Sequence, residues 1–266
     1  MSDLVSIITA AYNCESTISE TIKSVIRQTY TNWEMLIVDD FSTDNTTTVI
    51  NEFVQKDPRI KLIQLKNNSG TATARNTAIN NASGKYIALL DADDLWKPHK
   101  LEHQLHFMKS NNYSFTFTAY DVFKKSTDTK RKVFEVPPQV NYKQYMKNSI
   151  IGCLTVIIDK EQLPDFHMEQ GYLEDTLTWM FYLKRGVVAY GLNENLASYR
   201  INNGSKSSQK FKNATRYYKC LKQQEDVGFF SRIYYQSGYA YHAIKKRMFS
   251  KKIQITHERY EEHKKT

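Results

Sequence analysis

One stretch restricts the fold of this chain more than any other: an apolar run that ends abruptly in acidic residues. The run, residues 86–90 (YIALL), is followed at once by Asp91, Asp93 and Asp94. Because the run is continuously apolar rather than alternating, it predicts a strand buried on both faces, as in a parallel sheet covered by helices. In an open α/β sheet the carboxyl ends of the strands face the ligand crevice. We therefore expect these carboxylates at the edge of a crevice.

The same acidic residues predict a metal site. Side chains alternate along an extended chain, so Asp91 and Asp93 would lie on the same side. Two such carboxylates can hold a hard divalent cation, Mn²⁺ or Mg²⁺, with bound phosphates completing its coordination. A D-x-D motif alone is also common as an acidic turn, in which Asp94 would cap the next helix. The rest of the chain has to decide between these two interpretations.

The region around this stretch alternates between predicted strands and helices in units of roughly 30 residues. The predicted strands are residues 5–9, 34–38, 60–65 and 86–90. Between them, helices are predicted around 17–26, 49–54 and 71–81. In the first helix, Thr17 and Glu20 predict a capping box, and its apolar face would be Ile18, Ile22, Val25 and Ile26. This pattern is typical of an α/β fold, a Rossmann-like and mostly parallel sheet with helices on both faces.

After Asp94 the alternation becomes less regular. Apolar runs predict further strands at 113–123, 150–158, 187–191 and 196–199. A helix is predicted to begin at residues 173–175, where Glu174 and Asp175 would lie in its first turn, a position that favours acidic residues. Two long helices are predicted near the end, at roughly 211–224 and 231–249.

The charge is unevenly distributed and predicts a partner for the end of the chain. Residues 206–252 contain twelve Lys or Arg and two acidic residues, whereas residues 1–205 contain 22 and 23. Aromatic residues are interleaved with this basic run, which suits an anionic membrane surface. Two alternatives stay open: a surface helix pair packed on the body, and a nucleic-acid-binding segment. The nearly neutral first 205 residues argue against the latter, so no nucleic acid partner is expected.

The chain shows no sign of export or of a membrane span. No apolar run reaches about 18 residues, and no basic segment precedes the first predicted strand. The three cysteines, Cys14, Cys153 and Cys220, have no metal-binding spacing and fit a reducing cytoplasm. We therefore expect a cytoplasmic protein associated peripherally with the inner face of the cell membrane.

Six motifs in order resemble the family 2 glycosyltransferases, which have the GT-A fold. They are VSIITAAYN (5–13), DDFSTD (39–44), GTATARN (70–76), LLDADD (89–94), LEDTLTW (173–179) and YRINNGSKS (199–207). Each motif is weak alone, but the series covers about the first 205 residues. The resemblance implies inverting transfer of a sugar from a nucleotide diphosphosugar, expected to be a UDP-sugar. The implied acceptor is a glycan or a lipid-linked glycan in capsule, O-antigen or lipooligosaccharide synthesis.

The resemblance also implies roles for individual residues. Tyr12 would stack near the nucleobase, Asp40 would bind the base, and Asp93, with Asp91, would ligate Mn²⁺ or Mg²⁺. Asp175 occupies the position of the catalytic base, with Glu174 as the competing candidate. The implied nucleotide-sugar site as a whole consists of Ala10, Ala11, Tyr12, Asp40, Arg75, Asp91, Ala92 and Arg200.

Two departures from the family pattern are visible. Ala10 and Ala11 replace the usual hydroxyl or proline residues of the first turn, and Asn202 stands where a histidine is common. Asparagine is a weaker ligand, so a third protein ligand to the metal is in question. The expected organisation is a catalytic domain over 1–205, divided into a nucleotide-sugar half (1–95) and an acceptor half (96–205), and a basic helical section over 206–266. The alternative function is a catalytically silent nucleotide-sugar-binding or scaffold protein.

Overall fold

The N-terminal part of the chain forms a parallel sheet. The structure, a computed structural model, describes residues 3–125, 127–128, 130–201, 210–249 and 251–254. The strands β1 (Val5–Ala11), β2 (Trp33–Asp39), β3 (Ile60–Gln64) and β4 (Tyr86–Leu89) are parallel and lie in the order β3-β2-β1-β4. Each overlaps its predicted range. Their carboxyl ends therefore meet at one edge, as expected.

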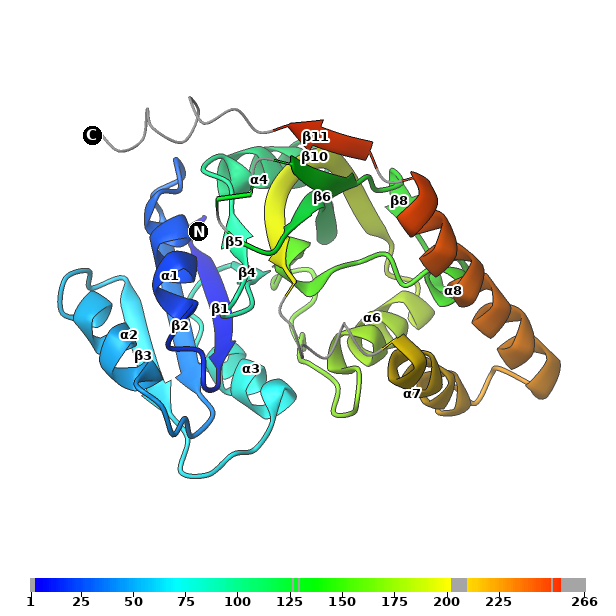
Figure 1. Cartoon of the computed structure of the whole chain (residues 1–266), viewed down its shortest axis with the longest axis horizontal. Coiled ribbons are helices and arrows are strands. Elements are labelled where there is room, and N and C mark those ends of the chain that lie inside the picture. The colour runs from blue at the N-terminus through cyan, green and yellow to red at the C-terminus, as the bar shows by residue number, and fades with distance from the viewer. Residues whose placement is uncertain (1–2, 126, 129, 202–209, 250, 255–266) are drawn as a thin grey trace.

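Helices cover both faces of this sheet. α1 (Ile18–Ile26) and α2 (Thr46–Val54) pack on one face and α3 (Thr71–Asn80) on the other (Figure 1). Alternate residues of β4 confirm that it is buried on both sides: Ile87 and Leu89 join the α3 cluster, whereas Ala88 joins the α1 cluster. Burial on both faces is the reason that the run is continuously apolar.

Two details of α1 were predicted wrongly. The side chain of Thr17 accepts no capping hydrogen bond, because its hydroxyl donates to the carbonyl oxygens of Cys14 and Ala92. Ile26 is 39% exposed rather than buried, since it lies in the last turn of the helix. The hydroxyl of Thr17 instead connects α1 to the acidic residues that follow β4.

Beyond β4 the sheet becomes mixed, because a late strand is inserted into it. The elements that follow are β5 (Leu95–Trp96), α4 (Lys100–Ser110), β6 (Phe115–Phe123), β7 (Lys130–Phe134), β8 (Gln139–Val140), α5 (Tyr142–Lys147), the 3₁₀ turn η1 (Cys153–Thr155) and β9 (Ile157–Asp159). β9 lies between β4 and β6 and is antiparallel to both. The predicted strand 150–158 is therefore mostly wrong. Most of its residues are buried, but most of them lie in a turn and connecting segments, which need apolar side chains as much as a strand does.

The second half ends in one helix and one long strand. α6 (Glu174–Lys184) begins as predicted, and β10 (Ala189–Arg200) is a single strand where two short ones were expected. β10 runs parallel to β6, and the pairing shifts in register on either side of Asn195. A strand that carries bulges loses its regular alternation, which explains the predicted break.

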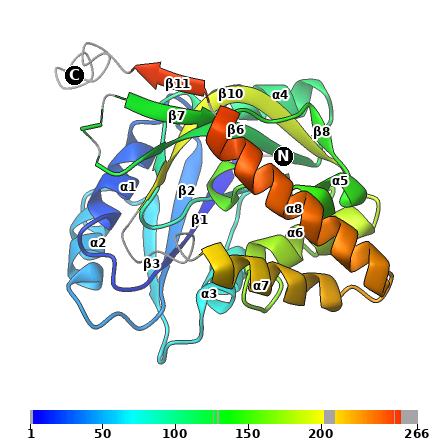
Figure 2. The same cartoon turned by 45° about the vertical axis from the view of Figure 1, so that its right-hand side comes forward.

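The C-terminal section packs on the body of the protein. α7 (Lys210–Lys222) and α8 (Phe229–Phe249) lie on the side of the molecule opposite β3, and β11 (Lys251–Gln254) pairs antiparallel with β7 (Figures 1 and 2). Tyr217, Leu221 and Val227 belong to the α3-side core cluster, and Tyr235 and Tyr239 pack against it. The predicted helix pair is confirmed. Within the described residues, no helix has the length and apolar character needed to cross a membrane.

Candidate active site

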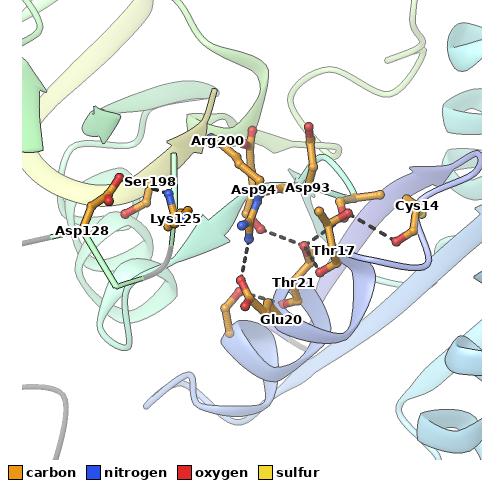
Figure 3. A network of polar contacts seen from close by, with 12 residues as sticks. Cys14, Thr17, Glu20, Thr21, Asp93, Asp94, Lys125, Asp128, Ser198 and Arg200 are labelled. Atoms are coloured by element: carbon orange, nitrogen blue, oxygen red, sulfur yellow. Dashed lines mark hydrogen bonds and ion pairs between the residues drawn. The ribbon is translucent and has the colours of Figure 1, made fainter. Parts of the chain in front are cut away.

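The acidic residues after β4 form a turn rather than an extended segment. The N–H of Asp94 donates to the carbonyl oxygen of Asp91 (3.1 Å), which closes the turn. The carbonyl oxygen of Ala92 accepts hydrogen bonds from Thr17 and Thr21, both at 3.0 Å. Figure 3 shows how α1 supports this acidic turn, residues 91–94. The prediction that Asp91 and Asp93 lie in an extended segment is therefore wrong.

Asp94 is an internal support of this turn. Its side chain is fully buried, Oδ1 accepts the Arg200 N–H at 2.7 Å, and Oδ2 has no hydrogen-bond partner among the described residues. Burial raises the pKa of Asp94 well above its usual value, and the charges of Asp93 and Asp91 raise it further. It does not cap α4, which begins six residues later. The raised pKa favours the neutral form of Asp94, so the negative charge that the turn offers to a ligand comes from Asp91 and Asp93.

Arg200 binds to the same turn from β10. Its Nε donates to the carbonyl oxygen of Asp93, and its Nη2 pairs with Oε2 of Glu20, both at 2.6 Å (Figure 3). The arginine is only 7% exposed and its guanidinium lies over the ring of Phe123. In this structure its donors are directed at protein acceptors. Asn202 and Lys206, which follow it in the YRINNGSKS motif, lie outside the described residues.

Arg75 joins the two halves of the candidate site. It projects from α3 with its side chain 5% exposed, and its guanidinium pairs with Oδ1 of Asp91 and, at 3.2 Å, with Oε1 of Glu174. Glu174 lies 99 residues further along the chain, at the start of α6. The predicted nucleotide residues Arg75 and Asp91 therefore lie together, and Arg75 also contacts one of the two candidate bases, Glu174.

The second candidate base, Asp175, has a different environment. Its Oδ1 accepts the N–H of Thr176 at 2.6 Å. In the part of the chain that the structure describes, no basic side chain lies within 4.0 Å of its carboxylate, in contrast to Glu174. Burial, and then the charge of Glu174, raise the pKa of Asp175 from 3.8 to about 6. A carboxylate with such a pKa can accept a proton near neutral pH.

The predicted nucleobase residues lie at the ends of β1 and β2. Tyr12 is 50% exposed directly after β1, whereas Ala11 is buried and Ala10 half-buried. Asp40 is buried, and its two carboxylate oxygens accept the N–H groups of Ser69 (2.7 Å) and Gly70 (2.9 Å). Asp40 therefore holds the loop that leads into α3.

Sequence reasoning missed one exposed aromatic residue at this edge. Phe41 follows Asp40 and is 52% exposed, with a backbone φ of 66°. A bulky residue is uncommon in this left-handed region. The loops that carry Tyr12 and Phe41 are joined by a hydrogen bond from the N–H of Asn13 to Oγ of Ser42 (3.0 Å). No pattern in the sequence signals a positive φ at a phenylalanine.

The donor set of the acidic turn fits a hard divalent cation. Asp91 and Asp93 offer only carboxylate oxygens, which Mg²⁺ and Mn²⁺ prefer. Among the described residues, the one trio of His, Cys, Asp or Glu whose ligand atoms lie within 4.8 Å of one another is His99, Glu102 and His103, exposed at the start of α4. The acidic turn is not such a trio, so phosphate oxygens of a ligand would have to complete the coordination of a cation there.

The chain matches known glycosyltransferases over most of its length. The family model described as Glycosyl transferase family 2 matches residues 6–158. TuaG of Bacillus subtilis, a glycosyltransferase assigned to teichuronic acid biosynthesis, is 42% identical over 92% of this chain and 98% of its own length. WfgD of Escherichia coli is 41% identical over 94% of this chain and 97% of its own length. It is named as a UDP-Glc:α-D-GlcNAc-diphosphoundecaprenol β-1,3-glucosyltransferase.

Solved structures show the same fold at low sequence identity. Staphylococcus aureus TarS, residues 1–349 in complex with UDP-GlcNAc, superposes with a TM-score of 0.67 at 18% identity, over 89% of this chain and 71% of that one. The mannosyltransferase PcManGT of Pyrobaculum calidifontis, in complex with GDP-Man and Mn²⁺, gives the same TM-score and identity over 88% and 69%. The predicted GT-A fold is confirmed.

Proposed function

We propose a donor and an acceptor for this chain, which belongs to glycosyl transferase family 2 and is therefore a glycosyltransferase. It transfers a sugar from a UDP-sugar to a hydroxyl of a lipid-linked glycan acceptor in cell-surface polysaccharide synthesis. The name of WfgD, at 41% identity, supports both the donor nucleotide and the lipid-linked acceptor. Transfer occurs with inversion, by a single displacement. The acceptor oxygen forms a bond to the anomeric carbon while the bond to the UDP leaving group breaks.

Asp175 is the general base of this reaction. A sugar hydroxyl is a weak nucleophile, so a carboxylate has to take its proton as the new bond forms, an effect of typically about 10²–10⁴-fold in rate. The observation that carries the proposal is the contrast within the first turn of α6: Glu174 is paired with Arg75, whereas the pKa of Asp175 is raised to about 6. Pairing with a guanidinium makes a carboxylate a poorer proton acceptor, so we assign the role to Asp175 rather than Glu174.

The remaining residues bind the donor. Asp93 and Asp91 would hold Mn²⁺ or Mg²⁺, and a bound cation would stabilise the charge that the diphosphate gains as it leaves. Arg75 lines the diphosphate beside Asp91, Tyr12 stacks on the base, and Asp40 binds the base through the lone pairs that its hydrogen bonds to the loop leave available. Ala10, Ala11 and Ala92 form the adjoining backbone surface. Arg200 supports the acidic turn, and it can reach the diphosphate only if its ion pair with Glu20 opens.

The acceptor in this proposal is attached to a lipid, so the protein works at a membrane surface. Residues 206–252, with twelve basic and two acidic residues, would attract an anionic leaflet. The expected location is the cytoplasmic face of the cell membrane, where the protein is bound peripherally.

The test is a donor panel. UDP-sugars and GDP-mannose are incubated with the protein and a GlcNAc-diphospholipid analogue, with Mn²⁺ or with EDTA, and the product is analysed by mass spectrometry. We expect Mn²⁺-dependent transfer from a UDP-sugar and a product of inverted anomeric configuration. Binding of UDP-sugars with no transfer to any acceptor would favour the silent binding protein. Equal transfer in EDTA would remove the metal from the proposal.

A further inference from the structure

One helix of the C-terminal section exposes an apolar face to solvent. The exposed residues of α8 include Phe230 (85%), Ile233, Tyr234, Tyr241 (61%) and Ile244. With 3.6 residues per turn, these five positions lie within an arc of roughly 100° on the helix. We call this arc the outer face of α8. Large apolar side chains gathered on one exposed stripe usually mark a surface that binds something.

The opposite side of α8 packs on the body near the proposed base. Tyr239 stacks on Tyr217 at 4.2 Å between ring centroids, and an added Cβ at Gly238 would stand 3.3 Å from the carbonyl oxygen of Lys147. Burial, and then the charge of Asp175, raise the pKa of Tyr239. α8 also packs on α5, which in turn packs on α6, the helix that carries Asp175 in its first turn. The inner side of α8 therefore lies toward this part of the candidate site, while the outer face is exposed.

The charge of this segment indicates what covers the outer face. Residues 227–252 contain six Lys or Arg and no acidic residue. Lys147 also lies over the ring of Tyr234, 4.9 Å from its centroid. Two copies of this face would bring like charges together, which disfavours self-association. Aromatic and aliphatic side chains beside lysine and arginine are the composition of helices that lie in the interface of anionic bilayers.

We propose that the outer face of α8 inserts into the headgroup region of an anionic bilayer and holds the Asp175 side of the active site at the membrane surface. The inference rests on the proposed function for the lipid-linked acceptor and adds the docking element and its orientation. Attraction by the basic residues alone would be lost at high salt. Insertion of the outer face supplies a second, salt-resistant contribution to binding.

Insertion is tested directly with a fluorescent probe on the helix. Phe230→Trp places an indole at the most exposed of these positions. As a control, Ile26→Trp places an indole on α1, which lies on the opposite side of the molecule from α8 (Figure 1). Each is mixed with phosphatidylcholine vesicles with or without phosphatidylglycerol, some carrying brominated acyl chains. After subtraction of the wild-type signal, we expect a blue shift and bromine quenching for the probe at 230 with anionic vesicles, and neither for the probe at 26.

A four-fold variant tests the contribution of the face to binding. Phe230, Ile233, Tyr241 and Ile244 are changed to Ser, with Ile26→Ser as the matched control, and folding is checked by thermal unfolding. We expect the four-fold variant to partition onto anionic vesicles at least about ten-fold more weakly, most clearly at high salt, while the control is unchanged. Substituting Lys245, Lys246, Arg247, Lys251 and Lys252 by Gln should instead remove mainly the salt-sensitive part.

The outcomes separate this inference from the proposed function. If the outer face only docks the protein, transfer to a water-soluble acceptor analogue is equal in wild type and the four-fold variant, and transfer to a vesicle-borne acceptor falls in the variant. An unquenched probe at 230 on protein that still binds vesicles would overturn the inference, as would a dimer that the four-fold variant abolishes. Absence of transfer by wild type to either acceptor would instead contradict the proposed function.

Discussion

Replacing Asp175 by Asn should make the protein more stable while it loses activity. In the folded protein, burial and the charge of Glu174 raise the pKa of Asp175 from 3.8 to about 6. The ionised form is therefore disfavoured by folding, and each pH unit between the two values corresponds to about 1.4 kcal/mol. The ionised carboxylate then costs the wild type up to about 3 kcal/mol of unfolding free energy. Asparagine has nearly the same shape, and its oxygen can still accept the N–H of Thr176.

The pH dependence of this gain follows from the direction of the pKa change. Below pH 3.8 the wild-type carboxyl is protonated in both the folded and unfolded states, so the variant has no advantage. Between pH 3.8 and about 6 the unfolded chain ionises first and wild type loses stability. Above about pH 6 the difference reaches its plateau. The measurement is urea unfolding of both proteins at matched pH values, because titrations of all other groups then cancel in the difference.

Activity should change in the opposite direction. If Asp175 is the base, turnover by the Asn variant falls by about 10²-fold or more, and kcat/KM of wild type rises with pH through about 6. Glu174→Gln is the matched control, because it removes a carboxylate paired with Arg75 and should lower stability. The reasoning is refuted if the Asp175 variant gains no stability at pH 8, or if it keeps its activity while the Glu174 variant loses it.

Three further outcomes are expected. Asp93→Ala should abolish transfer and weaken UDP-sugar binding, and EDTA should have the same effect on wild type. Isothermal titration and turnover assays measure this, and a fully active variant would mean that the cation binds elsewhere. Arg75→Met should lower unfolding free energy by about 3 kcal/mol, because it leaves two carboxylates without their cation, and a loss under 1 kcal/mol in urea unfolding would contradict that account. Gly191→Ala should cost about 1–3 kcal/mol, since the added Cβ would stand 2.1 Å from the carbonyl oxygen of Pro137; an unchanged melting temperature would show that the backbone there can move.

The strand–helix units of the first half could be predicted because β1, β2 and β4 are buried on both faces and are therefore mostly apolar along their whole length. In the second half, a run of apolar residues no longer indicates a strand. Residues 150–158 are apolar because they are buried, yet only the last of them form a strand. The break predicted within β10 reflects bulges near Asn195, which no local pattern distinguishes from a loop.

The candidate site could be predicted as a set of residues but not as a set of contacts. The order of the motifs predicted that Arg75, Asp91 and Glu174 belong to one site. It could not predict the ion pair between Arg75 and Glu174, which lie 99 positions apart in the sequence. The acidic turn was predicted as extended, because its bend depends on hydrogen bonds from Thr17 and Thr21 of another helix. The direction in which α8 turns its aromatic residues likewise depends on packing, since its sequence has apolar residues all around.

The insertion of β9 between β4 and β6 has a consequence for how the chain is made. When the ribosome has released residues 1–95, β4 has one neighbour, β1, and its other edge carries unpaired backbone groups. Such an edge can recruit foreign strands. Its partner arrives only with residues 157–159. The nucleotide-sugar half should therefore not be stable as a fragment, and the interval between the synthesis of β4 and β9 is the period in which the nascent chain is most exposed to aggregation.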